Sequence, residues 1–118
     1  MAHQNKFSLA ISTFKQALLD ATEVNNKPLI VKGMVNISRA MIADKNKKDA
    51  IPYLRETMSL TIDLPPSHVK SYVFISISRL YSNLIELDNK LTKRLMPLAS
   101  ETLHLAAFSA NHNNDKRA

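Results

Sequence analysis

Apolar residues recur at steps of three and four along the first part of the chain, which is the period of one face of an α-helix. This pattern predicts a first helix from about residue 6 to residue 24. Asn25, Asn26 and Pro28 form a polar break that ends it. The apolar face consists of Phe7, Ala10, Ile11, Phe14, Ala17, Leu18 and Ala21.

The same pattern predicts four further helices along the rest of the chain. They are expected at residues 28–44, 49–64, 67–87 and 92–109. Asp49 and Ser67 are the expected N-caps of the third and fourth helices. Pro52 would then fall in the first turn of its helix, where the missing N–H is not needed. Pro97 has the corresponding place in the fifth helix, whose effective start is therefore expected near Arg94.

Two alternating units recur with a period of 40 residues. Residues 10–18 align with residues 50–58, and a third copy at 95–103 follows 45 positions later. A different unit at 34–41 aligns with 74–81. Two alternating helical units with a common period indicate a helical-repeat array, and such arrays mostly bind other proteins.

Composition agrees with a helical domain. The chain has 118 residues, of which 45% are apolar, and its one glycine is Gly33. The absence of cysteine excludes disulfides and thiolate metal sites. We find no apolar run long enough to span a bilayer and no signal-peptide core, so a cytoplasmic location is the default expectation. The formal charge of +6 favours acidic partners.

The repeated units carry bulky and small residues at fixed steps. We call the helices expected at 28–44 and 67–87 A helices, and the other three B helices. Along an A helix the repeated positions hold a bulky, an apolar, a small and a second bulky residue. Along a B helix they alternate between small and large residues. The A positions are Met34, Ile37, Ser38 and Met41, then Phe74, Ile77, Ser78 and Tyr81. The B positions are Ala10, Phe14 and Ala17, then Ala50, Leu54 and Thr57. This arrangement resembles the tetratricopeptide repeat over roughly residues 7–107.

The resemblance implies an all-α fold, built as a right-handed α–α superhelix of five helices in antiparallel pairs. It also implies protein or peptide binding on a concave face of A helices. The small residues Ser38, Ala50 and Thr57 should be buried where helix backbones approach. The chain departs from the family in its period, 40 instead of 34 residues, and in its order B–A–B–A–B. Repeats of the HEAT class also fit this period.

Arg39 and Arg79 occupy equivalent A-helix positions and would lie on one wall of the groove. Paired guanidinium groups suit carboxylates, which each can bind through two hydrogen bonds. The predicted partner-binding residues are Lys32, Arg39, Tyr72, Arg79 and Asn83. The alternative is that both arginines are merely solvated, or pair with acids such as Asp44 or Glu56.

Two basic turns offer a nucleic-acid alternative. The lysines and arginine of these turns could contact the phosphates of a nucleic acid. However, exposed turns between helices are commonly charged, and no aromatic residue lies among these basic residues to stack on a base. The residues are Lys45, Lys47 and Lys48 in one turn, and Lys90, Lys93 and Arg94 in the other.

The sequence gives no sign of an enzyme or a cofactor. The four histidines are scattered, and a single glycine rules out a glycine-rich phosphate loop. We expect one domain at residues 1–109, followed by a disordered polar tail at 110–118. The predicted function is binding of an extended acidic segment of a protein. A dimerisation or sensory segment of a larger bacterial regulator is the first alternative.

Overall fold

The structure is a computed structural model that describes the backbone of residues 2–117 and the side chains of residues 8–109. This part of the chain contains five α-helices and no strand, which confirms the predicted all-α class. The helices are α1 (Ala2–Glu23), α2 (Lys27–Ala43), α3 (Lys47–Ile62), α4 (His68–Leu87) and α5 (Thr92–Arg117), with a 3₁₀ helix η1 (Asn89–Leu91) before α5. The right-handed sense of the superhelix stays a prediction.

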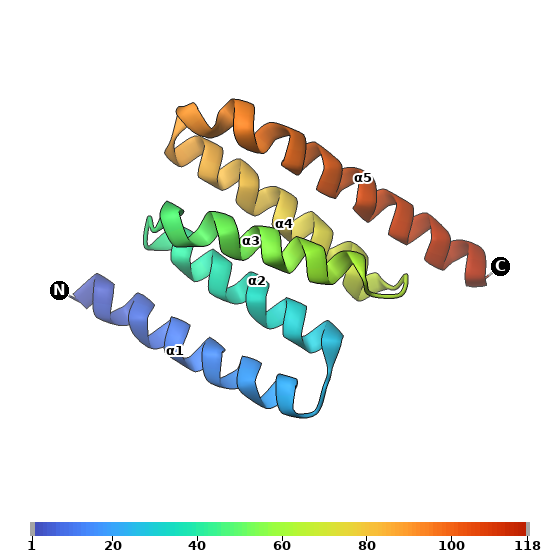
Figure 1. The fold of residues 1–118 in the computed structure, drawn as a ribbon, viewed down its shortest axis with the longest axis horizontal. Coiled ribbons are helices and arrows are strands. Elements are labelled where there is room, and N and C mark those ends of the chain that lie inside the picture. Colours follow the sequence, from blue (N-terminus) through green and yellow to red (C-terminus); the bar gives the residue numbers. More distant parts are fainter. Residues whose placement is uncertain (1, 118) are drawn as a thin grey trace.

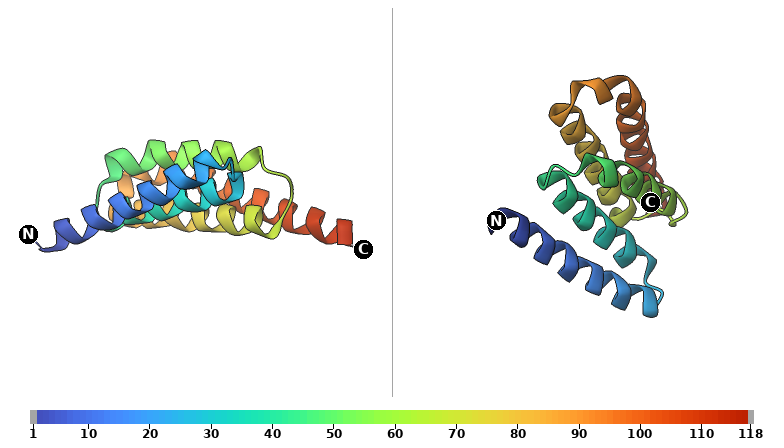
Figure 2. Two further views of the ribbon diagram at one scale, coloured as in Figure 1. Left: turned by 90° about the horizontal axis from the view of Figure 1, so that it is seen from below. Right: turned by 60° about the vertical axis from the view of Figure 1, so that its left-hand side comes forward.

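Consecutive helices run antiparallel, so α2 and α4 point in the same direction (Figure 1). The helices α2, α3 and α4 all contact one another, while α1 packs on α2 and α5 packs on α4. Figure 2 shows α3 on one side of the pair formed by α2 and α4. The result is a thin slab with extents of 53 × 37 × 17 Å, in which the other side of the α2–α4 pair is left open.

The turns before α2 and α3 have the same backbone form. Each contains one residue in the left-handed region, Asn25 with φ 54° and Lys45 with φ 60°. The next residue, Asn26 or Asn46, donates its N–H to the carbonyl five positions earlier, at 3.0 and 2.8 Å. These bonds satisfy carbonyl groups at the end of the preceding helix, as in the usual C-terminal helix motif.

The start of α3 differs from the prediction. Asn46, and not Asp49, is the N-cap: its Oδ1 accepts from the Asp49 N–H at 3.3 Å. Its amide also donates to the Asp49 carboxylate at 2.9 Å, so the two polar side chains hold each other. The helix therefore begins at Lys47, and Pro52 lies beyond its first turn. Ser67 caps α4 as predicted, with its Oγ 3.1 Å from the amide of Lys70.

The last helix is longer than predicted at its far end. It begins at Thr92, includes Pro97, and continues to Arg117, past the expected end at Ser109. No proline or glycine follows Pro97, so the sequence holds no residue that would force the helix to stop. The side chains of residues 110–118 lie outside the described part of the chain, and the role of this tail stays a prediction.

The core lies between α2, α3, α4 and α5. Small residues allow close approach at Ser38, Ala50 and Thr57, all fully buried as the repeat predicted. On α1, Ala17, equivalent to Thr57, is exposed. This helix therefore packs on one side only. The largest fully buried side chains include Ile37, Leu54, Phe74, Ile77, Tyr81, Leu84 and Leu95.

Candidate partner-binding surface

The open side of the α2–α4 pair is the candidate site, here called the α2–α4 surface. Its residues recur at steps of three and four on each helix, so each set lies on one helical face. The α2 residues are Lys32, Asn36, Arg39 and Ala43, and the α4 residues are Tyr72, Ile75, Arg79, Asn83 and Glu86. Asn36 is half-buried, and the others are exposed.

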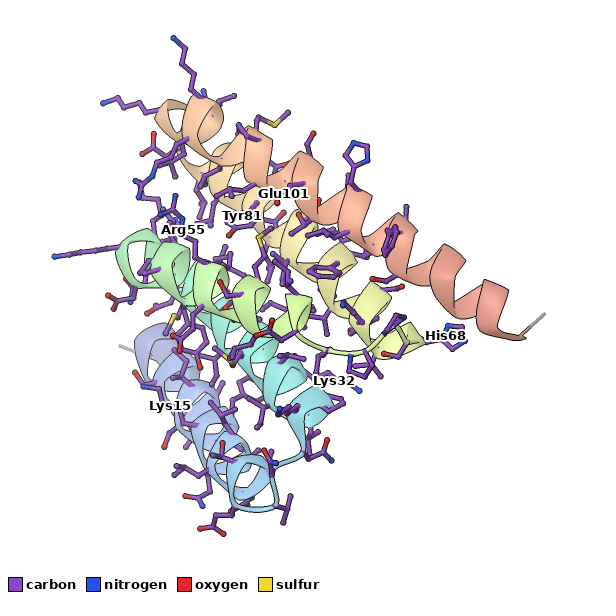
Figure 3. The ribbon with its side chains drawn as sticks, turned by 45° about the vertical axis from the view of Figure 1, so that its right-hand side comes forward. Lys15, Lys32, Arg55, His68, Tyr81 and Glu101 are labelled. Atoms are coloured by element: carbon purple, nitrogen blue, oxygen red, sulfur yellow. The ribbon has the colours of Figure 1, made fainter. Side chains whose placement is uncertain are left out.

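A shallow hollow lies at each end of this surface. Where the two helices begin, Lys32 of α2 faces His68, Val69 and Tyr72 of α4 across the first hollow. Lys32 and His68 are both labelled near this end in Figure 3. Neither hollow has a lining residue from α3, which indicates that they lie on the side of α2 and α4 away from α3. The second hollow, where the helices end, is lined by Ile42, Ala43, Lys45, Asn83, Glu86 and Leu87.

The structure therefore brings Lys32 and Tyr72 to one hollow and Asn83 to the other. Arg39 and Arg79 lie between the two ends along their helices, and both side chains are exposed. The Arg39 guanidinium donates to the Asn36 amide oxygen at 3.1 Å, a contact within one helix. No described residue forms a hydrogen bond or ion pair with the Arg79 side chain.

The ion pairs weighed for these arginines are absent. Among residues 8–109 the structure holds one ion pair, between Lys47 and Asp88, with Nζ 3.2 Å from Oδ2. Neither Asp44 nor Glu56 pairs with an arginine in this part of the molecule. Both guanidinium groups are therefore exposed and available to a ligand.

The helices α2 and α4 carry few acids. Together α2 and α4 contain five cations and a single anion, Glu86. One of these cations stabilises the fold, because Lys70 donates from Nζ to the carbonyl oxygens of Ile62 and Leu64, at the end of α3. Burial lowers the pKa of Lys70, and nearby Asp63 partly opposes this shift. On the α2–α4 surface, Glu86 is thus the one acid, against the three cations Lys32, Arg39 and Arg79.

Sequence reasoning missed His68, Val69, Lys45 and Glu86 as neighbours of the predicted site. Their spacing could have indicated three of them, because residues 68, 69 and 86 share a helical face with Tyr72, Arg79 and Asn83. Lys45 lies in a turn, where helical spacing gives no direction. Its place beside α4 follows only from the packing of α2 on α4.

The two basic turns lie at the same end of the molecule, and Lys47 links them. Asp88 Oδ1 accepts from the Lys90 amide at 3.0 Å, and Oδ2 accepts from the Lys47 ammonium at 3.2 Å. These two bonds hold the pKa of Asp88 below its ordinary value, and the bond from the Lys90 amide has the larger effect. Asp44 and Asp49 flank the lysines of the first turn, so acids interrupt the basic cluster.

A buried phenol lies elsewhere, between α3, α4 and α5. Tyr81 is fully buried, and its hydroxyl has no hydrogen-bond partner among the described residues. Figure 3 shows it close to Arg55 of α3 and Glu101 of α5. Burial raises the pKa of Tyr81 to about 12; Arg55 opposes this shift and Glu101 adds to it. The phenol is therefore neutral at ordinary pH, and it does not belong to the α2–α4 surface.

Comparisons with family models, with curated proteins and with solved structures found no match for this chain. Within the described residues, no helix is long and apolar enough to cross a membrane. The same residues contain no group of three or more histidines and acids that could hold a metal ion.

Proposed function

We propose that the chain is a tetratricopeptide-like module that binds an extended acidic segment of a partner protein along the α2–α4 surface. The observation that carries this proposal is the pair of exposed guanidinium groups, Arg39 and Arg79, at equivalent positions on neighbouring parallel helices. They lie on a surface that has a hollow at each end.

The chemistry of recognition follows from the charges. Carboxylates of the partner would accept bidentate hydrogen bonds from Arg39 and Arg79, and each such contact contributes on the order of 1.5–3 kcal/mol. Lys32 would add attraction at the start of the helices, and Tyr72 would supply an apolar ring with a polar tip. Glu86 would repel an acid at the other end, so the acidic part of the segment is expected over Lys32 and the arginines.

The length of α2 sets the size of the segment. With 17 residues, α2 is about 25 Å long at 1.5 Å per residue. An extended peptide covers this distance with roughly eight residues. A fluorescein-labelled peptide of that length, rich in Glu, is therefore a suitable probe, and the same peptide with Gln in place of Glu is its control.

The test measures binding by fluorescence anisotropy at low and physiological salt. Arg39→Ala and Arg79→Ala should each weaken binding of the Glu peptide about tenfold. The Gln peptide should bind poorly to every variant. Lys48→Ala is the matched control, since Lys48 is an exposed cation outside the surface. Circular dichroism checks that each variant is folded. If both arginine variants bind the Glu peptide as tightly as the wild type, the proposal is wrong.

One observation favours dimerisation as a second candidate. Met96 and Leu103, one heptad apart on α5, are 50% and 54% exposed at the edge of the slab where no further helix packs. A second copy would cover this edge. Sedimentation at increasing concentration tests the idea, and Leu103→Glu should abolish any dimer. A mass that stays monomeric at all concentrations contradicts it.

Nucleic-acid binding has weaker support. The two basic turns do lie together, but Asp44, Asp49 and Asp88 lie among them, and Lys47 is already paired with Asp88. A gel shift with labelled DNA and RNA at two salt concentrations tests this alternative.

A further inference from the structure

A half-open cleft of about 270 Å³ lies where the end of α1, the start of α2 and the end of α3 meet. Its apolar lining consists of Ile30 and Val31 of α2 and Leu60 of α3. Val31 is 1% exposed and Leu60 is 41% exposed, so the lining runs from the core to the surface. The cleft is formed with α1 and α3, and it shares no lining residue with the hollows of the α2–α4 surface.

The two helix pairs differ at the level of the cleft. In the second helix pair, Ser71 of α4 donates from Oγ to the carbonyl oxygen of Ala106 in α5, at 3.2 Å. The equivalent residue in α2, 40 positions earlier, is Val31, whose side chain has no donor. The start of α2 and the end of α3 therefore lack the bond that ties α4 to α5 at this level.

The mouth of the cleft is polar and carries one cation, Lys27, and one acid, Asp63. Lys27 is exposed, and no described residue pairs with its ammonium group. Asp63, also at the mouth, lies close enough to the Lys70 ammonium to interact with it. Glu23, the last residue of α1, does not line the cleft. The side chains of Thr22 and Asn25 complete the rim.

The apolar area continues beyond the cleft. A shallower hollow shares Asn25 and Lys27 with it, and is also lined by Val24, Pro28 and Pro65. Val24 is 72% exposed and adds apolar surface to this hollow. A chain-like ligand that leaves the cleft would therefore meet further apolar surface next to Lys27.

We propose that this cleft binds a small amphipathic carboxylate, with its alkyl chain against Ile30, Val31 and Leu60 and its carboxylate beside Lys27. The volume is slightly below the range of about 300–1,000 Å³ that drug-sized ligands occupy, which favours a short chain. Removal of alkyl surface from water drives the binding. The Lys27 charge selects an anionic head group over a neutral or cationic one.

The experiment titrates the full chain with octanoate, octanol and octylammonium, and follows amide chemical shifts by NMR. Octanoate should bind saturably, with the largest shifts at residues of the cleft, and about tenfold more tightly than octylammonium. Lys27→Gln should reduce octanoate affinity to that of octanol without changing octanol binding. Lys48→Gln, which removes an exposed cation elsewhere, should have no effect.

A second variant tests the apolar part. Leu60→Trp should fill the cleft and abolish binding of all three compounds, and the partial exposure of Leu60 leaves room for the larger ring. The proposal is overturned if octanoate does not saturate, if its shifts lie outside the cleft, or if Lys27→Gln and Leu60→Trp bind it like the wild type. None of these results bears on peptide binding at the α2–α4 surface, which the arginine variants test separately.

Discussion

Ser78 in α4 donates its hydroxyl to the carbonyl oxygen of Ala99 in α5 at 3.0 Å. Its repeat equivalent, Ser38 in α2, donates instead to Met34 in its own helix at 2.9 Å. Two serines at one position of the repeat thus have different roles, since one links two helices and the other bonds back to its own helix.

This difference predicts different costs of removing the hydroxyl. Ser78→Ala should destabilise the protein by about 1 kcal/mol, because a buried hydrogen bond between helices is lost. The Ala99 carbonyl keeps a bond from Thr102 at 2.9 Å, so the loss stays moderate. Ser38→Ala should be close to neutral, since alanine favours the helix. Urea unfolding measures both, and equal effects would contradict the distinction.

Ala50 provides a test of the repeat register. It is 0% exposed on α3, and Ala50→Leu should overpack the core and cost about 1–3 kcal/mol. Ala10 is the equivalent residue on α1, where it is only half-buried, so Ala10→Leu should cost much less. The comparison uses the urea midpoints of the two variants. An unchanged midpoint for Ala50→Leu would show that the close contact does not exist.

Asp88 should make stability depend on acidity. The pKa of its carboxyl is lowered in the folded protein by the Lys90 amide and by Lys47, relative to the ordinary value of 3.8. The contribution of Asp88 to the free energy of unfolding is therefore fully present above the ordinary pKa. It is lost as the pH falls through the lower pKa of the folded protein. Thermal melts of the wild type and Asp88→Asn from pH 7 to pH 2 measure this effect. The variant should lose less stability on acidification; parallel curves would exclude a role for the carboxylate.

Tyr81 should act at the alkaline end. Its pKa is raised to about 12 in the folded protein, so the unfolded chain ionises first, near pH 10. The contribution of Tyr81 to the free energy of unfolding is therefore fully present below pH 10 and falls as the pH rises towards 12. Tyr81→Phe removes the unpartnered hydroxyl and should be neutral or stabilising at pH 7, with a smaller loss at high pH. A large destabilisation at pH 7 would mean that the hydroxyl has a partner.

The helices and their order could be read from the chain because their causes are local. A period of three to four apolar residues, the cap at Ser67 and the polar breaks are all short-range signals. Where two local signals compete, the prediction was less accurate. Asn46 and Asp49 are both good caps, and the choice depends on how the turn after α2 closes.

The candidate surface could be read from the sequence only in part. Equivalence in the repeat led to Arg39 and Arg79, and the predicted set also included Lys32, Tyr72 and Asn83; all five are exposed. Equivalence could not indicate that Lys45 and Glu86 border the same hollow, because Lys45 lies in the turn after α2 and Glu86 lies on α4. Their proximity depends on how closely α2 and α4 pack.

The sequence by itself determined the all-α class, the alternation of two kinds of helix and the small residues of the core, such as Ala50. The tertiary structure alone decided that α3 covers one side of α2 and α4, that Lys47 bonds to Asp88, and that a cleft opens beside Val31. The physical reason is range. Helix formation follows from neighbours within one or two turns, whereas a cleft arises where packing between distant segments fails to fill the space.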